Sequence, residues 1–246
     1  MNAPFPNPPA PATRQPVLNL PIAVSGLIAF LVAIHAGRTM LLNPAADMRI
    51  VLEFAFIPIR IVEPELFVGF AMSGARVWSF LTYAFLHADW SHVLINALWL
   101  AAFGSPLARR FGTTRFLLFS AVGAVAGAAL HFAIDPNSQI PLVGASAAIS
   151  AQMAGASRFV FQQGGPMWRH AGDEAYRRPA APLSEIIRDS RVLMFLGVWF
   201  GVNLIFGLVG GGLSEGAVAW DAHIGGFLAG LLLFRYFDPV RAPTFG

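Results

Sequence analysis

The sequence contains no cysteine and no lysine, and it has few charged residues of either sign. Without cysteine, the chain has no disulfides, thiolate metal ligands, cysteine nucleophiles or lipidated cysteines. Only 12% of the 246 residues are charged and 56% are hydrophobic, whereas an ordinary soluble domain is about 25% charged. This number of charged residues is too small to cover the surface of a soluble protein of this size. With a mean hydropathy of +0.62, the composition predicts an integral membrane protein.

Six apolar segments approach the length that a hydrocarbon core of roughly 30 Å requires of a helix. They lie at about residues 20–36, 93–108, 116–134, 146–162, 192–210 and 222–237. We therefore predict an all-α membrane protein with a six-helix transmembrane bundle over residues 19–238. Residues 1–18 are Pro-rich and are expected to form a disordered cytoplasmic tail; residues 239–246 are expected to form a short C-terminal tail.

A long first outer loop is predicted at about residues 37–91, and its apolar runs are too short to span a membrane. Two interpretations remain open for this loop. It lies in the membrane interface beside the bundle, or it forms a small folded cap on it.

The distribution of arginine predicts the orientation of the chain. With the N-terminus in the cytoplasm, twelve of the sixteen arginines fall on the inner side and four on the outer side. This asymmetry follows the positive-inside rule. The same arginines explain a pI near 10.2, so no nucleic-acid partner is expected.

Polar residues begin three of the predicted helices, and all three helices run from outside to inside. These residues are His92 and Asn96, Ser146, and His223, so they share one depth just below the outer surface. Such residues are costly inside a membrane and usually mark function. A serine and a histidine at one depth form a nucleophile and a base, and His92, Asn96 and the Ser146 N–H are candidate oxyanion donors. Because Asp221 lies two residues before His223 and so not on the same helix face, we expect a dyad.

Two features of the helix starts and surfaces bear on this pair. Ser146 begins its helix, so we expect it to act as the helix N-cap as well as the nucleophile. Small residues at Gly226 and Gly230 favour a close approach of helices. A GxxxG spacing alone is weak evidence, because Gly123 and Gly127 repeat it in the third helix.

The sequence resembles the rhomboid intramembrane serine proteases, a likeness that covers residues 20–237. It rests on HADWSHVLIN at 87–96, GASA at 144–147 and AHIGGFLAG at 222–230, with Trp78 in the loop. The resemblance implies a Ser–His dyad. Its residues are Ser146 as nucleophile, His223 as base, His92 and Asn96 at the oxyanion, His87 as a hydrogen-bonding support of the loop, and Gly144, Gly226 and Gly230 as motif glycines.

The resemblance also implies an activity: hydrolysis of peptide bonds in transmembrane segments of membrane proteins, near the outer face, at small residues in segments of weak helicity. The expected localisation is a bacterial inner membrane, with the bilayer and transmembrane substrates as partners. No metal or other cofactor is expected.

Three departures from the family pattern stand beside the motifs. Ala147 follows the serine where glycine is usual, and its methyl group either crowds the oxyanion or stiffens the helix start. Ser150 replaces an aromatic residue that packs on the base, and Ser79 replaces a common arginine.

Several residues are expected to be structural. His35 and His131 are interpreted as structural histidines near helix ends. The aromatic residues of the fifth helix are expected to pack or to face lipid, with a substrate gate there implied only by resemblance; they are Phe195, Trp199, Phe200 and Phe206.

Other classes of membrane protein fit the sequence less well. A zinc intramembrane protease needs His-Glu-x-x-His, which is absent. An aspartyl intramembrane protease needs aspartates inside the spans, whereas every aspartate here lies at the end of a predicted span or in a loop. A transporter is expected to show internal repeats, and no convincing repeat is present. The alternative that stays open is a catalytically inactive rhomboid-like protein that binds transmembrane clients.

Overall fold

The computed structural model describes residues 19–167, 172–209 and 219–240. The predicted tail 1–18 lies outside these residues, as do 241–246 of the predicted C-terminal tail. The described residues form helices joined by turns and loops, with one isolated bridge between Phe56 and Leu142 and no strand among them. The longer helices are α1 (Ile22–Leu41), α2 (Pro44–Phe54), α4 (Ala75–Thr82), α5 (Trp90–Trp99), α6 (Ser105–Phe111), α7 (Thr113–Ile134), α8 (Ser146–Ser157), α10 (Ser190–Val209) and α11 (Trp220–Phe237). The short elements are α3 (Ile59–Val62), α9 (Leu183–Ile186), the 3-10 turns η1 (Pro64–Phe67), η2 (Tyr83–Phe85) and η4 (Asp173–Arg177), and the π-turn η3 (Leu100–Gly104).

Among the described residues, three helices are long and apolar enough to cross a membrane. They are α1, the continuous helix Trp90–Phe111 formed by α5, η3 and α6, and α7; the apolar part of α10 that is described in full, Ser190–Val202, is shorter. The all-α membrane class is therefore confirmed, whereas the count of six spans remains a prediction.

The fourth predicted span is shorter than expected, because α8 ends at Ser157 instead of 162. Its twelve residues cover about 18 Å at about 1.5 Å per residue. Two hydrogen bonds fix this end: the Arg158 Nε donates to the Ala181 carbonyl, and the Ala181 N–H donates to the Arg158 carbonyl, both at 2.8 Å. The chain thus turns into the loop while its residues are still apolar.

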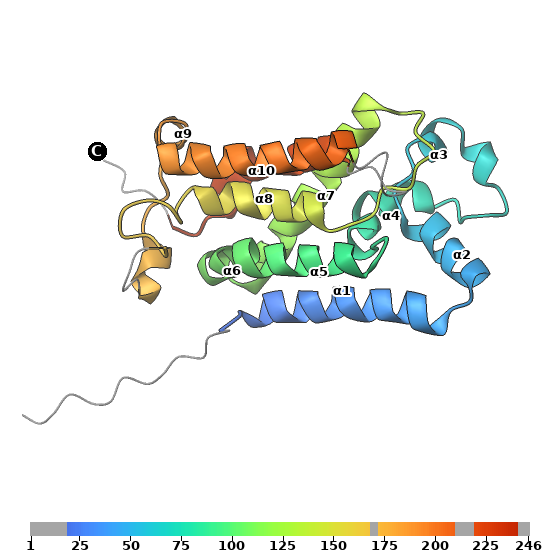
Figure 1. Ribbon diagram of the computed structural model, residues 1–246, viewed down its shortest axis with the longest axis horizontal. Coiled ribbons are helices and arrows are strands. Elements are labelled where there is room, and N and C mark those ends of the chain that lie inside the picture. Colours follow the sequence, from blue (N-terminus) through green and yellow to red (C-terminus); the bar gives the residue numbers. More distant parts are fainter. Residues whose placement is uncertain (1–18, 168–171, 210–218, 241–246) are drawn as a thin grey trace, which may run out of the picture.

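The predicted outer loop is largely helical. Helix α1 continues to Leu41, and α2, α3 and α4 gather at one end of the molecule, with α9 at the opposite end (Figure 1). Hydrogen bonds within this segment hold it together: Trp78 Nε1 donates to the Glu53 carbonyl at 3.1 Å, and Thr82 Oγ1 to the Phe54 carbonyl at 2.7 Å. The segment is therefore folded, and its bridge from Phe56 to Leu142 joins it to the loop that leads into α8.

Helix α8 lies at the centre of the bundle. Every residue from Ala147 to Ser157 is buried, and the helix packs mainly on α7, α11 and η3. Most of these residues are small, so neighbouring backbones approach closely. A short, central helix of this kind holds the residue at its start, Ser146, at a fixed depth between its neighbours.

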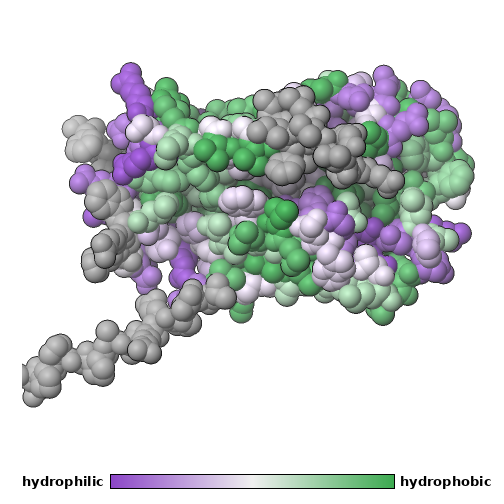
Figure 2. All heavy atoms as spheres, in the orientation of Figure 1, coloured by the Kyte–Doolittle hydropathy of each residue, from purple (hydrophilic) through white to green (hydrophobic). Residues whose placement is uncertain are grey.

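Large hydrophobic side chains are exposed along the sides of the bundle. Figure 2 shows hydrophobic residues over much of the middle of one face and hydrophilic residues toward its two ends. The exposed residues include Leu94, Ile95 and Leu98 on α5, Leu117 and Leu118 on α7, and Met194 and Val198 on α10. A soluble monomer rarely exposes apolar surface of this extent, so these faces agree with burial in lipid.

Candidate active site

Ser146 and His223 meet between the first turns of α8 and α11. The Nε2 atom of His223 lies 2.7 Å from the Oγ atom of Ser146, a hydrogen-bond distance. Ser146 is the first residue of α8, and Ala145 occupies the N-cap position. The expectation that Ser146 also caps its helix is therefore wrong, since its hydroxyl is directed to the imidazole of the neighbouring helix.

Glycines on α11 make this meeting possible. A β-carbon added at Gly226 would lie 2.0 Å from the carbonyl oxygen of Ala147, and one added at Gly230 would lie 2.3 Å from that of Ala151. No side chain fits in either space. The predicted small face of the sixth helix is thus the face that packs on α8, and the close approach of the two backbones brings the serine and the histidine together.

His92 and Asn96 lie beside the segment that precedes Ser146. Gly144 has a φ of +118°, and a β-carbon there would lie 2.7 Å from His92 Nε2 and 3.8 Å from Asn96 Nδ2. Only glycine combines this backbone conformation with such a close approach. Asn96 Nδ2 also donates to the His92 carbonyl at 3.0 Å. Two side chains with N–H groups therefore flank the chain two residues before the serine.

His87 is buried in the loop before α5, but it does not support that loop as expected. Neither ring nitrogen of His87 has a hydrogen-bond partner among the described residues. Its ring instead packs edge-to-face on His92, with 5.0 Å between centroids. The loop is held through the main chain, because Arg38 Nη1 donates to the His87 carbonyl at 3.0 Å. Burial lowers the pKa of His87 to about 3, so its ring is neutral at pH 7 and suits an apolar contact.

The two departures next to the nucleophile have structural explanations. The Ala147 methyl group faces α7, where a β-carbon at Gly127 would lie 2.5 Å from it. It therefore fills a gap between helices and does not enter the site. The Ser150 hydroxyl donates to the Ser146 carbonyl at 2.7 Å, within α8.

Aromatic packing on the base comes from another helix. The Trp199 ring of α10 lies against the His223 imidazole, with 6.1 Å between centroids and 44° between planes. The sequence interpretation treated Trp199 as a packing or lipid-facing residue and missed this contact. The sequence around Trp199 does not indicate a contact with His223, because the residues between α10 and α11 contain no recognised motif.

Asp221 and His131 form a buried pair beside the base. The two carboxylate oxygens of Asp221 lie 2.9 and 3.0 Å from His131 Nδ1. The structural role expected of His131 thus has a specific partner. The sequence contained a signal for this pair. His131 lies near the end of α7 and Asp221 near the start of α11, and these two ends lie on the same side of the bundle.

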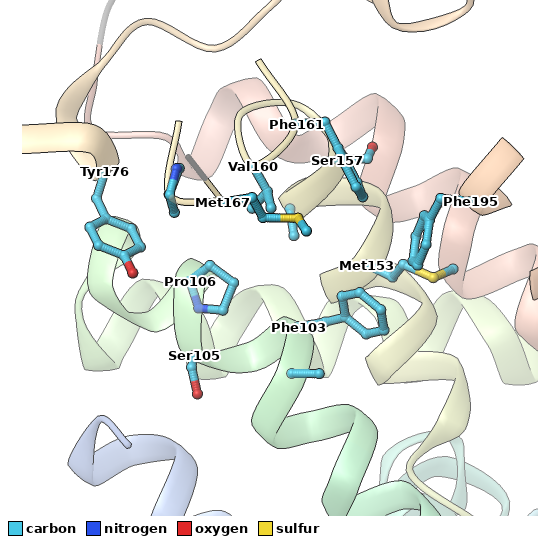
Figure 3. A pocket seen from close by; sticks show the side chains of 13 residues that line it. Phe103, Ser105, Pro106, Met153, Ser157, Val160, Phe161, Met167, Tyr176 and Phe195 are labelled. Carbon is cyan, nitrogen blue, oxygen red and sulfur yellow. The ribbon is translucent and has the colours of Figure 1, made fainter. Parts of the chain in front are cut away.

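A cavity of about 390 Å³ lies deeper in the bundle, apart from the Ser146–His223 pair. Figure 3 shows Phe103, Met153 and Phe195 close together at one side of it. Its lining is almost entirely apolar. Across the described parts of the chain, no group of three or more His, Asp or Glu side chains is placed to hold a metal ion.

The Rhomboid domain family model matches residues 74–238. The chain is 28% identical over 158 residues to the rhomboid protease GlpG of Yersinia pestis, a match covering 64% of this chain and 47% of that protein. It is 35% identical over 88 residues to Rhomboid-related protein 1 of Caenorhabditis elegans, covering 36% and 24% of the two chains. It is 36% identical over 77 residues to the human Rhomboid-related protein 3, covering 31% and 19%.

The matched segment contains the helices that bear Ser146 and His223, and it begins within the loop before α4. The chain spans about half the length of the Yersinia proteins that it matches. The family model covers well over half of the chain, which confirms the resemblance noted in the sequence. This chain belongs to the rhomboid family.

Proposed function

We propose that the protein is an intramembrane serine endopeptidase that cleaves transmembrane segments of membrane proteins with a dyad of Ser146 and His223. The observation that carries this proposal is the 2.7 Å separation of Ser146 Oγ and His223 Nε2. The serine hydroxyl attacks the carbonyl carbon of the scissile peptide bond, and the imidazole accepts its proton. The imidazolium then gives that proton to the leaving amine. Water hydrolyses the resulting ester and regenerates the serine.

The oxyanion of each tetrahedral intermediate requires donors that are already in place. The Ser146 N–H at the start of α8 is one candidate, because a helix N-terminus favours negative charge. The side chains of His92 and Asn96 are the others, supported by their position beside Gly144. A side chain at position 144 would collide with the His92 ring and displace it.

The proposal includes six membrane spans within residues 19–238, a cytoplasmic N-terminus and an active site near the outer face of a bacterial inner membrane. The arginine distribution supports this orientation. A shallow site allows water to reach the ester from the outer side. A substrate helix hides its peptide bonds, so cleavage takes place where small residues weaken that helix.

Cleavage by the purified protein tests the proposal. The protein is reconstituted in liposomes with a single-span membrane protein that carries small residues near the outer end of its span. Wild type is expected to cut this substrate, and Ser146→Ala and His223→Ala are expected to lose the cleavage. Ser157→Ala is the matched control, because this serine is buried on the same helix and its hydroxyl donates to the Ala154 carbonyl at 2.7 Å. Equal cleavage by wild type and Ser146→Ala would contradict the proposal.

A second candidate function is a rhomboid-like protein that binds transmembrane clients without cutting them. The departures from the family pattern at Ala147 and Ser150 favour it. In the same experiment, this function predicts co-purification of the client with wild type and no cleavage product. The hydrogen-bonded Ser146–His223 pair favours the protease.

A further inference from the structure

The base His223 is carried by the first turn of α11. Its N-cap residue, Ala219, has no side chain that accepts a hydrogen bond. The first helical backbone bond, from the His223 N–H to the Ala219 carbonyl, is long at 3.4 Å. The 2.7 Å distance between His223 Nε2 and Ser146 Oγ depends on how this turn is held between its neighbours.

The glycine contacts of α11 fix its distance from its neighbours. Gly226 packs on Ala147 of α8, and Gly225 packs on α7, where an added β-carbon would lie 2.6 Å from the Ala126 carbonyl oxygen. Smooth contacts of this kind hold two backbones close together. Sliding of α11 along its axis or rotation about it would displace the His223 ring.

The pair of Asp221 and His131 joins the first turn of α11 to the last turn of α7. His131 lies in the last turn of α7 and Asp221 in the first turn of α11, and their side chains are only 13% and 9% exposed. Asp221 Oδ1 also accepts the Ala222 N–H at 2.7 Å. A carboxylate only accepts hydrogen bonds, so Nδ1 of His131 carries the proton. The contact is therefore directional, and it joins the two helices at the level of the base.

We propose that His131 and Asp221 are positioning residues for the proteolytic reaction. Their pair sets the depth and rotation of the first turn of α11 and so holds His223 against Ser146. This inference rests on the proposed function. It pairs Asp221, which lies two positions before the base in the sequence, with His131 of the neighbouring helix, and so places Asp221 outside the reacting atoms and in a supporting role.

The opposite end of α11 offers a matched control. There, Arg110 and Asp238 form a buried ion pair with an N–O distance of 2.7 Å, and their side chains are 0% and 7% exposed. Substituting one member of either pair takes a hydrogen-bonding partner from a buried side chain, so substitutions in both pairs lower stability. Only the pair of His131 and Asp221 lies in the turn that carries the base.

The test measures the rate at which a fluorophosphonate probe modifies Ser146 in detergent-solubilised protein, together with the melting temperature and the KM and kcat for a transmembrane substrate. For His131→Ala and Asp221→Asn we expect a labelling rate ten- to a hundredfold below that of wild type and a lower kcat with KM little changed. For Asp238→Asn we expect a lower melting temperature with a labelling rate of the folded protein within about threefold of wild type. His131→Asn keeps an N–H donor near the position of Nδ1 and is expected to recover most of the rate.

The outcomes separate this inference from the proposed function. If wild type is labelled and His131→Ala is labelled at the same rate, the positioning role is wrong and the protease remains. If Asp238→Asn loses as much rate as His131→Ala, the effect is general destabilisation and the positioning role is again wrong. If folded wild type is neither labelled nor active, the proposed function fails and this inference fails with it.

Discussion

The methyl group of Ala147 lies between helices α8 and α7, on the side of Gly127. It is 1% exposed, so it contributes packing to the core of the bundle. Glycine at this position would leave a gap there and would add flexibility at the start of α8. The residue after the nucleophile therefore affects stability.

This account gives a prediction for Ala147→Gly, the change to the usual family residue. We expect the free energy of unfolding to fall by about 1–2 kcal/mol, because a buried methyl group is lost and glycine costs helix stability. The rate of Ser146 labelling is not expected to rise. Thermal unfolding in detergent and the labelling rate check the two parts. A several-fold faster labelling of Ala147→Gly would show that the methyl group does crowd the oxyanion.

The identities of the candidate site residues were predictable from the sequence, but their contacts were not. Ser146, His223, His92 and Asn96 were singled out because topology gives them one depth. The roles assigned to them remain predictions. The contact of Trp199 with His223 and the main-chain support of the His87 loop depend on packing between distant segments, which no local pattern records.

At the scale of helices, α8 is held between two glycine motifs. Gly226 and Gly230 of α11 pack on Ala147 and Ala151 from one side. Gly123 and Gly127 of α7 pack on the same two alanines from the other side, with added β-carbons 2.4 and 2.5 Å from the alanine methyl groups. The GxxxG spacing occurs twice in the sequence because each of the two glycine pairs packs on one side of α8.

A substitution at Gly230 tests this arrangement. For Gly230→Ala we expect a loss of about 1–3 kcal/mol of stability, the usual cost of overpacking, together with loss of cleavage, because α11 must move away from α8. Gly197→Ala on α10 is the control, since nothing lies within 4 Å of its added β-carbon. Circular dichroism during heating measures both variants. Equal melting temperatures for Gly230→Ala and wild type would contradict the close packing of the two helices.

Element boundaries were less predictable than element type. The fourth helix was expected to reach 162 and ends at Ser157, because its end is fixed by hydrogen bonds between Arg158 and Ala181, 23 residues apart. The segment at 37–91 contains three α-helices that were not recognised. Their stabilising bonds, such as that from Trp78 to Glu53, connect residues remote in sequence.

At the scale of the whole molecule, charge distribution sets the expected orientation in the membrane. The absence of cysteine makes this orientation measurable, because a single introduced cysteine is the only thiol. Asn137→Cys lies in a loop that is predicted to be outside, and Gln163→Cys in one that is predicted to be inside; both positions are exposed.

In intact bacterial spheroplasts, a membrane-impermeant maleimide is expected to label Asn137→Cys and to leave Gln163→Cys unlabelled until the membrane is opened. The reverse pattern would mean that the chain is inverted and that the dyad lies near the inner face. Labelling of both in intact cells would contradict a bilayer-spanning bundle between these two positions.

The central claim is that His223 activates Ser146 as a nucleophile. The most direct measurement is mass spectrometry of the protein after reaction with a fluorophosphonate. The account predicts one covalent adduct, located on Ser146 in wild type and absent from both Ser146→Ala and His223→Ala. Folded wild type without an adduct, or an adduct that persists in His223→Ala, would contradict it.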